Sequence, residues 1–557
     1  MYMSVFFATV SATFIGASKT VLPNVEVISS MVASFPAHPL RAFSPLLKLV
    51  HLSTLSEFVF DTILFLQLIL YIFMGIRIYT YFGSQSPKMP RGTNLSDPKV
   101  ITGKQIGFST KREVKSLATT RAASGRIVLG EFSAVDGLLS FICSILRFKM
   151  KKPFLISSES GHSVLVIGPT QSHKTSGFAI PAILEWEGPI IATSVKSDLM
   201  RDTIPHRSKL GEVFVIDPTN STGLSNCHFS PVKAASTWPN AKKIARDLSL
   251  LADSLNSGIE DSAFWYQMAA KLLAPLLFAA CVGDKSMADV IRWLDVHEIS
   301  EPTRILIDAG VIEAIQSAEA SWKREERQLA SIYATAENIV EAFSLVESKQ
   351  NIDFEPSNLF KGQNTLYLCA PAHDQVRMVP YFATAVSHIL NSAYDQVART
   401  GKPLDPPLLV VLDEAANIAP ISNLDTFAST SSSQGIQLVS IWQDIAQIKS
   451  RYGTKGATVI NNHRTKVILS GVSDPETLEV ISSLMGQVRS RTTTTSRDSF
   501  GSFSHSMGHE YRPMMEKSAL RGIKPGTGIV IHGHLAPFEI KLRPWFKDKK
   551  LKNLVHD

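Results

Sequence analysis

The 557-residue sequence contains only four cysteines, which lie far apart and include no Cys-x-x-Cys pair. This spacing argues against a zinc site or a disulfide framework, so we expect reduced, structural thiols. The sequence also lacks, at its start, the basic segment that precedes the apolar part of a secretory signal. Charged residues make up 19% and hydrophobic residues 45% of the chain, so the composition predicts folded cores in more than one domain.

Acidic residues are the minority charge, with 49 Asp and Glu against 56 Lys and Arg and a formal net charge of +7. Such a balance favours an anionic partner, either nucleic acid or a membrane surface. Part of the excess is local, because residues 77–126 hold ten Lys or Arg and two acidic residues. Ordinary juxtamembrane basicity therefore explains some of the charge.

Two apolar stretches near the start have few or no charges. Residues 1–18 have none, and we expect either a first membrane helix or a loosely membrane-associated segment. The only charged residues within 58–78 are Asp61 and Arg77. In a helix they would be about 24 Å apart, so both would lie near the edges of a ~30 Å hydrocarbon core. This predicts a transmembrane helix, with a buried core helix as the rival interpretation. The basic segment that follows predicts that the rest of the chain is cytoplasmic.

Residues 163–175, S-V-L-V-I-G-P-T-Q-S-H-K-T, have the layout of a P-loop, with a strand, an anion-binding loop and a helix. Lys174 is expected to reach the β- and γ-phosphates of ATP, and the Thr175 hydroxyl to hold Mg²⁺. The expected nucleotide-binding residues are Gly168, Pro169, Thr170, Gln171, Ser172, His173, Lys174 and Thr175.

The loop lacks the usual glycine before the lysine and has His173 there. A left-handed backbone at a residue other than glycine costs roughly 1–2 kcal/mol, although His adopts it more often than most residues. A large domain can remain folded despite a conformational cost of this size. The loop motif alone is also short enough to arise by chance, so the assignment depends on a second motif.

That second motif is L-L-V-V-L-D-E at 408–414, an apolar strand followed by two acids. Open α/β sheets bind ligands at the carboxyl ends of their strands. Asp413 is therefore expected to hold Mg²⁺, and Glu414 to polarise the attacking water. A strand that ends in a solvated acidic turn is the alternative. Gln443, after the next strand, is a candidate γ-phosphate sensor, and a capping or surface glutamine is its alternative.

Short Val/Ile/Leu runs alternate with helical patterns, which predicts a buried parallel sheet with helices on both faces, a RecA-like α/β core. The expected strands after the loop are 189–193, 213–217, 365–370, 408–412, 436–441, 465–470 and 528–532. Residues 490–509 are rich in Ser and Thr, and we expect a mobile loop there. The expected organisation is a membrane anchor (1–82), a basic linker (83–124), a nucleotide-binding domain (125–231 and 349–557) and an inserted all-helical domain (232–348).

Several segments together resemble the TraG/TraD-type coupling proteins of type IV secretion and bacterial conjugation. The segments are GPTQSHKTSGFAIPAIL, TSVKSDL, LLVVLDEAANIAPISNLDTFAS, QGIQLVSIWQDIAQIKSRYG and TKVILSGVSDPETLEVISSLMG. By this resemblance Lys174 and Thr175 match the Walker A pair, Asp413 and Glu414 the Walker B pair, and Gln443 the sensor glutamine. Lys196 and Asp198 match a further segment of the family, with a less certain role.

The resemblance implies a hexameric ATPase in the bacterial inner membrane, with ATP and Mg²⁺ as cofactors. Its implied partners are relaxase-bound single-stranded DNA or an effector protein, and the subunits of a type IV secretion channel. Many family members have arginines before the GIQL strand, one of them proposed to act on a neighbouring subunit's nucleotide, but residues 429–434 are S-T-S-S-S-Q. An arginine finger can contribute roughly 10³–10⁵ in rate, so either another arginine substitutes or hydrolysis is slow.

Two other functions remain open from the sequence. A membrane scaffold that binds ATP with little turnover is compatible with both departures from the family pattern. A translocase of the FtsK or HerA kind is disfavoured by the helical insertion and by the segment ANIAPISNLDTFAS after Glu414.

Overall fold

The computed structural model describes residues 108–109, 112–122, 125–132, 154–255, 262–344, 352–371, 373, 375–418, 421, 423–497 and 503–556. The predicted membrane segments 1–18 and 58–78, and most of the linker 83–124, lie outside these residues.

A twelve-stranded sheet organises the described chain, in the order β1-β3-β2-β16-β15-β12-β4-β11-β10-β5-β9-β6. Its strands are β1 (Ala118–Thr119), β2 (Val128–Phe132), β3 (Phe154–Ser157), β4 (Val164–Ile167), β5 (Ile190–Ser194), β6 (Val213–Ile216), β9 (Thr365–Cys369), β10 (Leu408–Leu412), β11 (Ile436–Trp442), β12 (Thr465–Leu469), β15 (Thr527–His532) and β16 (Phe538–Lys541). Each expected strand is present to within one or two residues of its predicted bounds.

The sheet is mixed. Strands β12, β4, β11, β10, β5, β9 and β6 run parallel, whereas β15 pairs antiparallel with β12, and β16, β2, β3 and β1 continue antiparallel from it. The expectation of a parallel sheet is therefore wrong for the run 528–532. An apolar run does not encode strand direction, and the long connection from β12 to β15 permits either direction.

Alternate residues of the parallel strands enter two separate cores. Leu165 and Ile167 of β4 belong to one buried cluster, and Val164 and Val166 to the other. Because successive side chains of a strand point to opposite faces, a sheet covered on both faces buries every position, which explains the continuous apolar runs.

One face is covered by η3 (Thr175–Ala179, a π-helical turn), α6 (Ile180–Leu184), α7 (Ser197–Leu210) and α22 (Lys549–His556). The other is covered by α16 (Gln375–Thr400), α17 (Leu424–Thr430), α18 (Ile445–Tyr452), α19 (Gly456–Asn462) and α20 (Pro475–Met485). Short elements complete the described chain: η2 (Glu113–Leu117), α8 (Pro231–Ala234), α15 (Pro356–Leu359), η4 (Ser431–Gln434), η5 (Gly453–Lys455) and α21 (Lys517–Arg521).

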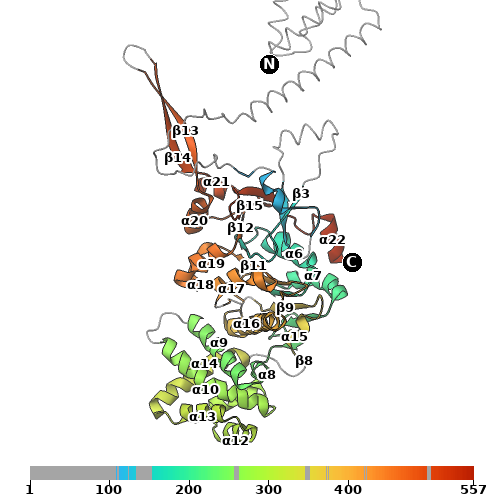
Figure 1. The fold of residues 1–557 in the computed structure, drawn as a ribbon, viewed down its shortest axis with the longest axis vertical. Helices are drawn as coiled ribbons and strands as arrows, with labels where there is room; N and C mark the ends of the chain where they lie inside the picture. The colour runs from blue at the N-terminus through green and yellow to red at the C-terminus, as the bar shows by residue number, and fades with distance from the viewer. Residues whose placement is uncertain are drawn as a thin grey trace, which may run out of the picture. The chain divides into compact units, whose positions relative to one another are not determined.

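A group of helices interrupts the alternation of strands and helices and gathers together in Figure 1. It contains α9 (Trp238–Leu255), α10 (Ser262–Val282), α11 (Met287–Asp295), α12 (Ser300–Ala309), α13 (Ile312–Trp322) and α14 (Glu326–Ser344). The parallel pair β7 (Cys227–His228) and β8 (Ile352–Asp353) joins the chain before and after the group.

Helix α10 is the one helix among the described residues that is long and apolar enough, over Ala263–Val282, to cross a membrane by length and composition. Its apolar window is 61% buried within the protein. It packs against α9, α12, α13 and α14. This burial is typical of the core helix of a helical domain, so its composition does not make it a membrane span.

The Ser/Thr-rich region forms a hairpin of β13 (Gln487–Arg497) and β14 (Phe503–Pro513), paired from Gln487 opposite Pro513 to Arg497 opposite Phe503. The expectation of a mobile loop is therefore wrong for residues 490–497 and 503–509, while 498–502 lie outside the described residues. Threonine is β-branched and favours extended backbone, so a run of threonines supports strands even where large aliphatic residues are scarce.

Candidate nucleotide-binding site

The loop after β4 turns tightly against two neighbouring strands. The Gly168 N–H donates to the Trp442 carbonyl at the end of β11, at 3.0 Å. A Cβ on Gly168 would lie 2.6 Å from Ser172 Oγ and 2.9 Å from Leu469 Cβ. Real Cβ atoms essentially never come that close to another heavy atom, and Leu469 Cβ cannot move away, so only glycine fits where the loop begins. Within the loop, Ser172 Oγ donates to the Pro169 carbonyl at 2.7 Å.

Two loop residues other than glycine have left-handed backbone, Gln171 with φ 65° and His173 with φ 66°. Left-handed residues alternating with right-handed ones turn successive N–H groups toward one concave side, which binds anions. The His173 imidazole is held at the rim, where its Nδ1 lies 3.1 Å from Ser176 Oγ. The site therefore has the loop conformation that glycine usually provides, with a side chain added.

Lys174 carries a buried charge for which the described residues provide no hydrogen-bond partner. Its side chain is 7% exposed and its Nζ is unpaired. Burial lowers the pKa of Lys174, while the nearby carboxylates of Asp413, Glu414 and Asp444 act in the opposite direction. A buried ammonium without hydrogen bonds is costly unless a ligand pairs with it. The arrangement thus fits an anion at the loop.

Asp413 and Thr175 meet across the site, with Thr175 Oγ1 donating to Asp413 Oδ2 at 2.8 Å. The second carboxylate oxygen, Oδ1, is buried and has no partner among the described residues. Burial raises the pKa of Asp413 to about 6, partly opposed by the bond from Thr175. Hydroxyl and carboxylate oxygens are the ligands that Mg²⁺ prefers. These two side chains therefore fit a magnesium ion, which would stabilise the ionised form of Asp413.

Glu414 follows directly and has left-handed backbone, with φ 57°. Its carbonyl accepts from the Asn417 N–H at 2.9 Å, and its Oε2 lies 3.4 Å from Asn417 Nδ2. The neighbouring Ala415 N–H donates to the Ile441 carbonyl of β11 at 3.1 Å. Strained backbone concentrates at functional sites, and here the turn after β10 fixes the position of the Glu414 side chain.

Strand register brings the remaining candidate, Gln443, to the same edge. Trp442 pairs with Ile167, and Leu412 with Ser440, so β4, β11 and β10 end within two residues of one another. Gln443 is the residue after Trp442 and lies between the P-loop and the acidic pair. Its backbone N–H donates to Gln447 Oε1 at 3.1 Å. The structure brings all the predicted residues to one edge, and their individual roles remain predictions.

Two further charges belong to this edge. Asp444 caps α18 by accepting from the Gln447 N–H at 2.8 Å, and its charge acts on Lys174. Sequence reasoning did not assign it, although an Asp just before a helical pattern is a recognisable N-cap signal. Lys196, after β5, is close enough to Lys174 for its charge to lower that pKa. Lys196 of the TSVKSDL segment therefore lies near the site.

The serine-rich stretch that replaces the family's arginines lies elsewhere. Residues 429–434 end α17 and form η4, and Gly435 separates them from the first residue of β11. Ser431 Oγ lies 3.3 Å from Ser163 Oγ, just before β4 begins. This is the opposite edge of the sheet from the P-loop. An arginine in this stretch could therefore act only on another subunit's nucleotide.

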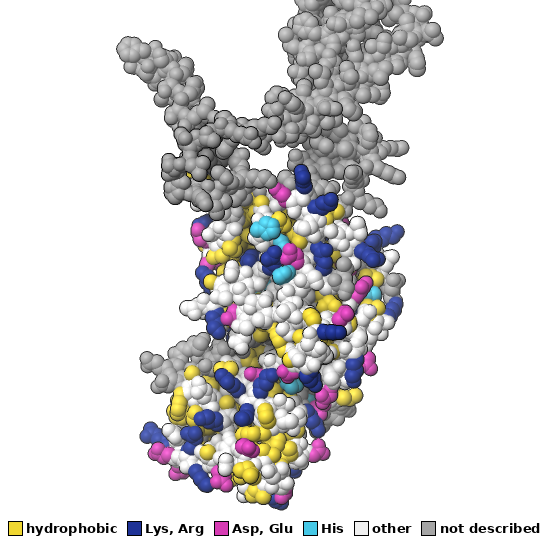
Figure 2. Space-filling model, in the orientation of Figure 1, with side chains coloured by type: hydrophobic (Ala, Val, Ile, Leu, Met, Phe, Trp, Pro, Cys, Tyr) yellow, Lys and Arg dark blue, Asp and Glu magenta, His cyan; other side chains and the backbone are white. Residues whose placement is uncertain are grey.

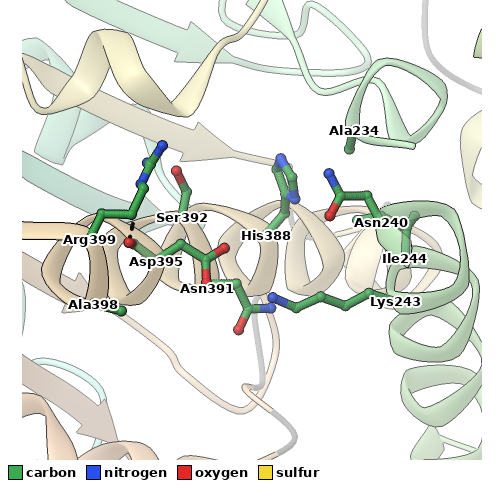
Figure 3. A pocket seen from close by; sticks show the side chains of 10 residues that line it. All are labelled: Ala234, Asn240, Lys243, Ile244, His388, Asn391, Ser392, Asp395, Ala398 and Arg399. Carbon is green, nitrogen blue, oxygen red and sulfur yellow. Dashed lines mark hydrogen bonds between the residues drawn. The ribbon is translucent and has the colours of Figure 1, made fainter. Parts of the chain in front are cut away.

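Away from the P-loop, a hollow of about 580 Å³ lies between α9 and α16, and none of the P-loop residues lines it. Figure 3 shows Lys243 of α9 extending toward Asn391 of α16, with His388 and Arg399 on the same helix as Asn391. Burial and the neighbouring Lys243 lower the pKa of His388 to about 4, so this imidazole is neutral at pH 7. The hollow is polar and lined by both charge signs, because Asp395 also faces it.

Parallel strands with a P-loop after β4 and an acidic pair after β10 define a RecA-like P-loop protein. Residues 126–556 match the family described as Type IV secretory system Conjugative DNA transfer, and the chain belongs to that family.

Among curated relatives, the chain is 20% identical to VirD4 of Rhizobium radiobacter, over 72% of this chain and 59% of that protein. It is 22% identical to the conjugal transfer protein TraG of Agrobacterium fabrum, over 82% and 73% of the two chains. The chain thus spans about six-tenths of the VirD4 relatives it matches.

Solved structures of the conjugative coupling protein TrwB share the fold. The unbound form has a TM-score of 0.56 at 16% identity and covers 77% of this chain and 96% of its own. TrwB in complex with ADP and Mg²⁺ has a TM-score of 0.53, over 77% and 97% of the two chains.

The left-handed conformation of His173 lets us predict the effect of placing glycine at this position. In His173→Gly, we expect ATP turnover to be kept or raised, because glycine adopts φ 66° without the roughly 1–2 kcal/mol cost of a side chain. Steady-state phosphate release measures this. A fall in turnover, with thermal stability unchanged, would mean instead that the imidazole itself binds phosphate.

Proposed function

We propose that this protein is a membrane-anchored coupling ATPase that recruits a substrate and drives it into a type IV secretion or conjugation channel. The substrate is relaxase-bound single-stranded DNA or an effector protein, and the partners are the channel subunits. ATP and Mg²⁺ bind at the loop 168–175 with Asp413, and six copies form the working ring. The inner membrane of a bacterium holds the chain through residues 58–78, with most of the chain in the cytoplasm.

The observation that carries the proposal is the pair of unsatisfied buried groups on either side of the Thr175–Asp413 bond. Lys174 Nζ and Asp413 Oδ1 are both buried and unpaired among the described residues. One is the partner that a phosphate oxygen requires, and the other is the partner that a magnesium ion requires. Solved complexes of the related TrwB with ADP and Mg²⁺, and with a non-hydrolysable ATP analogue, support this occupancy.

The domain layout is part of the proposal. We assign 125–231 and 349–557 to the nucleotide-binding domain and 232–348 to an inserted all-helical domain. The position of helices α9–α14 between the paired strands β7 and β8 supports this division. On the face drawn in Figure 2, Lys and Arg side chains of the described residues alternate with acidic and apolar ones. A DNA-binding surface is therefore better sought on other faces, including those that line a ring.

A scaffold that binds ATP with little turnover is the second candidate. It is favoured by residues 429–434, which offer no arginine to a neighbouring subunit. The two functions differ in DNA-stimulated hydrolysis. The test measures phosphate release by the full chain, in detergent or membranes, with and without single-stranded DNA. Stimulated turnover supports the coupling ATPase, and tight nucleotide binding without turnover supports the scaffold.

A further inference from the structure

The C-terminal segment after β16 packs along the first turn that follows Lys174. The Trp545 N–H donates to the Ser176 carbonyl at 3.0 Å. A Cβ on Gly177 would lie 3.2 Å from His173 Cβ and 3.5 Å from Leu542 Cβ, so the segment lies in contact with this turn. Residues 542–548 therefore form a wall beside the P-loop that the sequence motifs did not indicate.

A buried ionic clamp fixes this wall to the helix. Arg543 donates from Nη1 and Nη2 to the two carboxylate oxygens of Glu185, both at 2.9 Å, and from Nε to Asp548 at 2.8 Å. Arg543 is 6% exposed, and Glu185 directly follows α6. A two-pronged guanidinium–carboxylate pair fixes orientation as well as distance, so the wall is held in place before any ligand binds.

At the end of the wall, Phe546 presents an aromatic side chain to solvent beside the loop. It is 44% exposed, and its ring centroid lies 6.2 Å from that of His173. Lys547 Nζ lies 5.9 Å from the same ring centroid. Trp545, 5.9 Å away and nearly perpendicular, supports the ring from behind. An exposed phenylalanine on a clamped segment next to a phosphate loop has no role in packing the core.

We propose that Phe546 is the platform on which the nucleobase stacks, and that His173 and Lys547 border it. This deepens the nucleotide-binding function proposed above and rests on it. When the loop N–H groups bind the phosphates, the ribose and base would extend past the turn at Ser176. The segment 542–548 lies beside this turn. Every base has a π-face, so the platform accepts purines without base-specific hydrogen bonds.

The test compares nucleotides with an inorganic polyphosphate that carries no base. Dissociation constants of ADP, GDP and inorganic tripolyphosphate are measured by calorimetry on the full chain, without reliance on turnover. We expect Phe546→Ala to weaken ADP and GDP roughly 5- to 150-fold, the range of base–aromatic stacking, and to leave tripolyphosphate unchanged. Phe546→Trp should retain the parent affinities, since indole also stacks.

The chain offers a matched control. Phe264, at the start of α10, is also 44% exposed and also lies beside a tryptophan, with its ring 5.2 Å from that of Trp265. Phe264→Ala should bind all three ligands as the parent does.

Three results would overturn the proposal. If Phe546→Ala binds ADP as tightly as the parent, only the platform is wrong. If it loses tripolyphosphate equally, Phe546 shapes the loop and does not bind the base. If the parent itself binds neither ADP nor tripolyphosphate, the nucleotide-binding function is wrong as well.

Discussion

Replacing Lys174 by alanine is expected to weaken ATP binding while leaving the folded protein as stable as the parent or more stable. The binding loss follows from the phosphates losing a charged donor, about 1.5–3 kcal/mol, which is roughly 10- to 150-fold in affinity. The stability gain follows from the unpaired, 7% exposed ammonium. Burial lowers the pKa of Lys174 below the ordinary lysine value, so protonation favours the unfolded chain, and this penalty is present at neutral pH, which lies well below the ordinary lysine pKa.

Calorimetry and thermal unfolding of the nucleotide-free protein measure the two effects. The matched control is Lys466 of β12, which is also buried and has a lowered pKa, about 8, caused by burial. Its Nζ donates to the His463 carbonyl at 2.7 Å, near the start of β12 at the opposite edge of the sheet. Lys466→Met should leave ATP affinity unchanged. If Lys174→Ala binds ATP as tightly as the parent, the P-loop assignment is wrong.

The parallel half of the sheet could be predicted because burial on both faces requires continuous apolar runs. The runs 408–412 and 465–470 therefore mark β10 and β12 closely. The antiparallel half could not be predicted in the same way. Strand β16 pairs with β2 through Lys541 and Glu131, which are far apart in the sequence, so no local pattern specifies this pairing. The composition of the hairpin β13–β14 does not predict strands, because Ser-rich and Gly-containing segments are also typical of loops, and the β-propensity of threonine is the local signal that favours them.

The residues of the site also differ in whether the sequence alone could predict them. Residues in motifs, such as Lys174 and Asp413, have spacings dictated by the phosphate and the metal, and those spacings can be recognised in a sequence. Phe546 and Arg543 lie beside the loop only because β16 lies at a particular place in the sheet. Contacts of that kind depend on tertiary packing across more than 360 residues of chain, counted from Lys174 to Phe546. Left-handed φ at His173 was foreseeable, because the loop requires it whichever residue stands there.

Glu414→Gln is expected to bind ATP with parent affinity and to lose hydrolysis by roughly 10²–10⁴-fold, the usual contribution of a positioned general base. Glutamine has the same shape, so the left-handed turn at φ 57° and the Asn417 N–H bond to the residue 414 carbonyl remain. What is lost is the carboxylate charge that orients and polarises water. Single-turnover hydrolysis and equilibrium binding, measured on the same preparation with single-stranded DNA, separate the two effects.

Glu479 provides the control, since it is 64% exposed on α20, pairs with Lys517 and lies outside the P-loop, the acidic pair and Gln443. Glu479→Gln should hydrolyse ATP at the parent rate. Because residues 429–434 lack arginine, the parent rate itself is expected to be low without DNA and to rise when a ring assembles on it. A parent protein whose turnover never exceeds that of Glu414→Gln, even with DNA and membranes present, would show that Glu414 activates no water. The buried Lys174–Asp413 site would then bind nucleotide to hold a scaffold together.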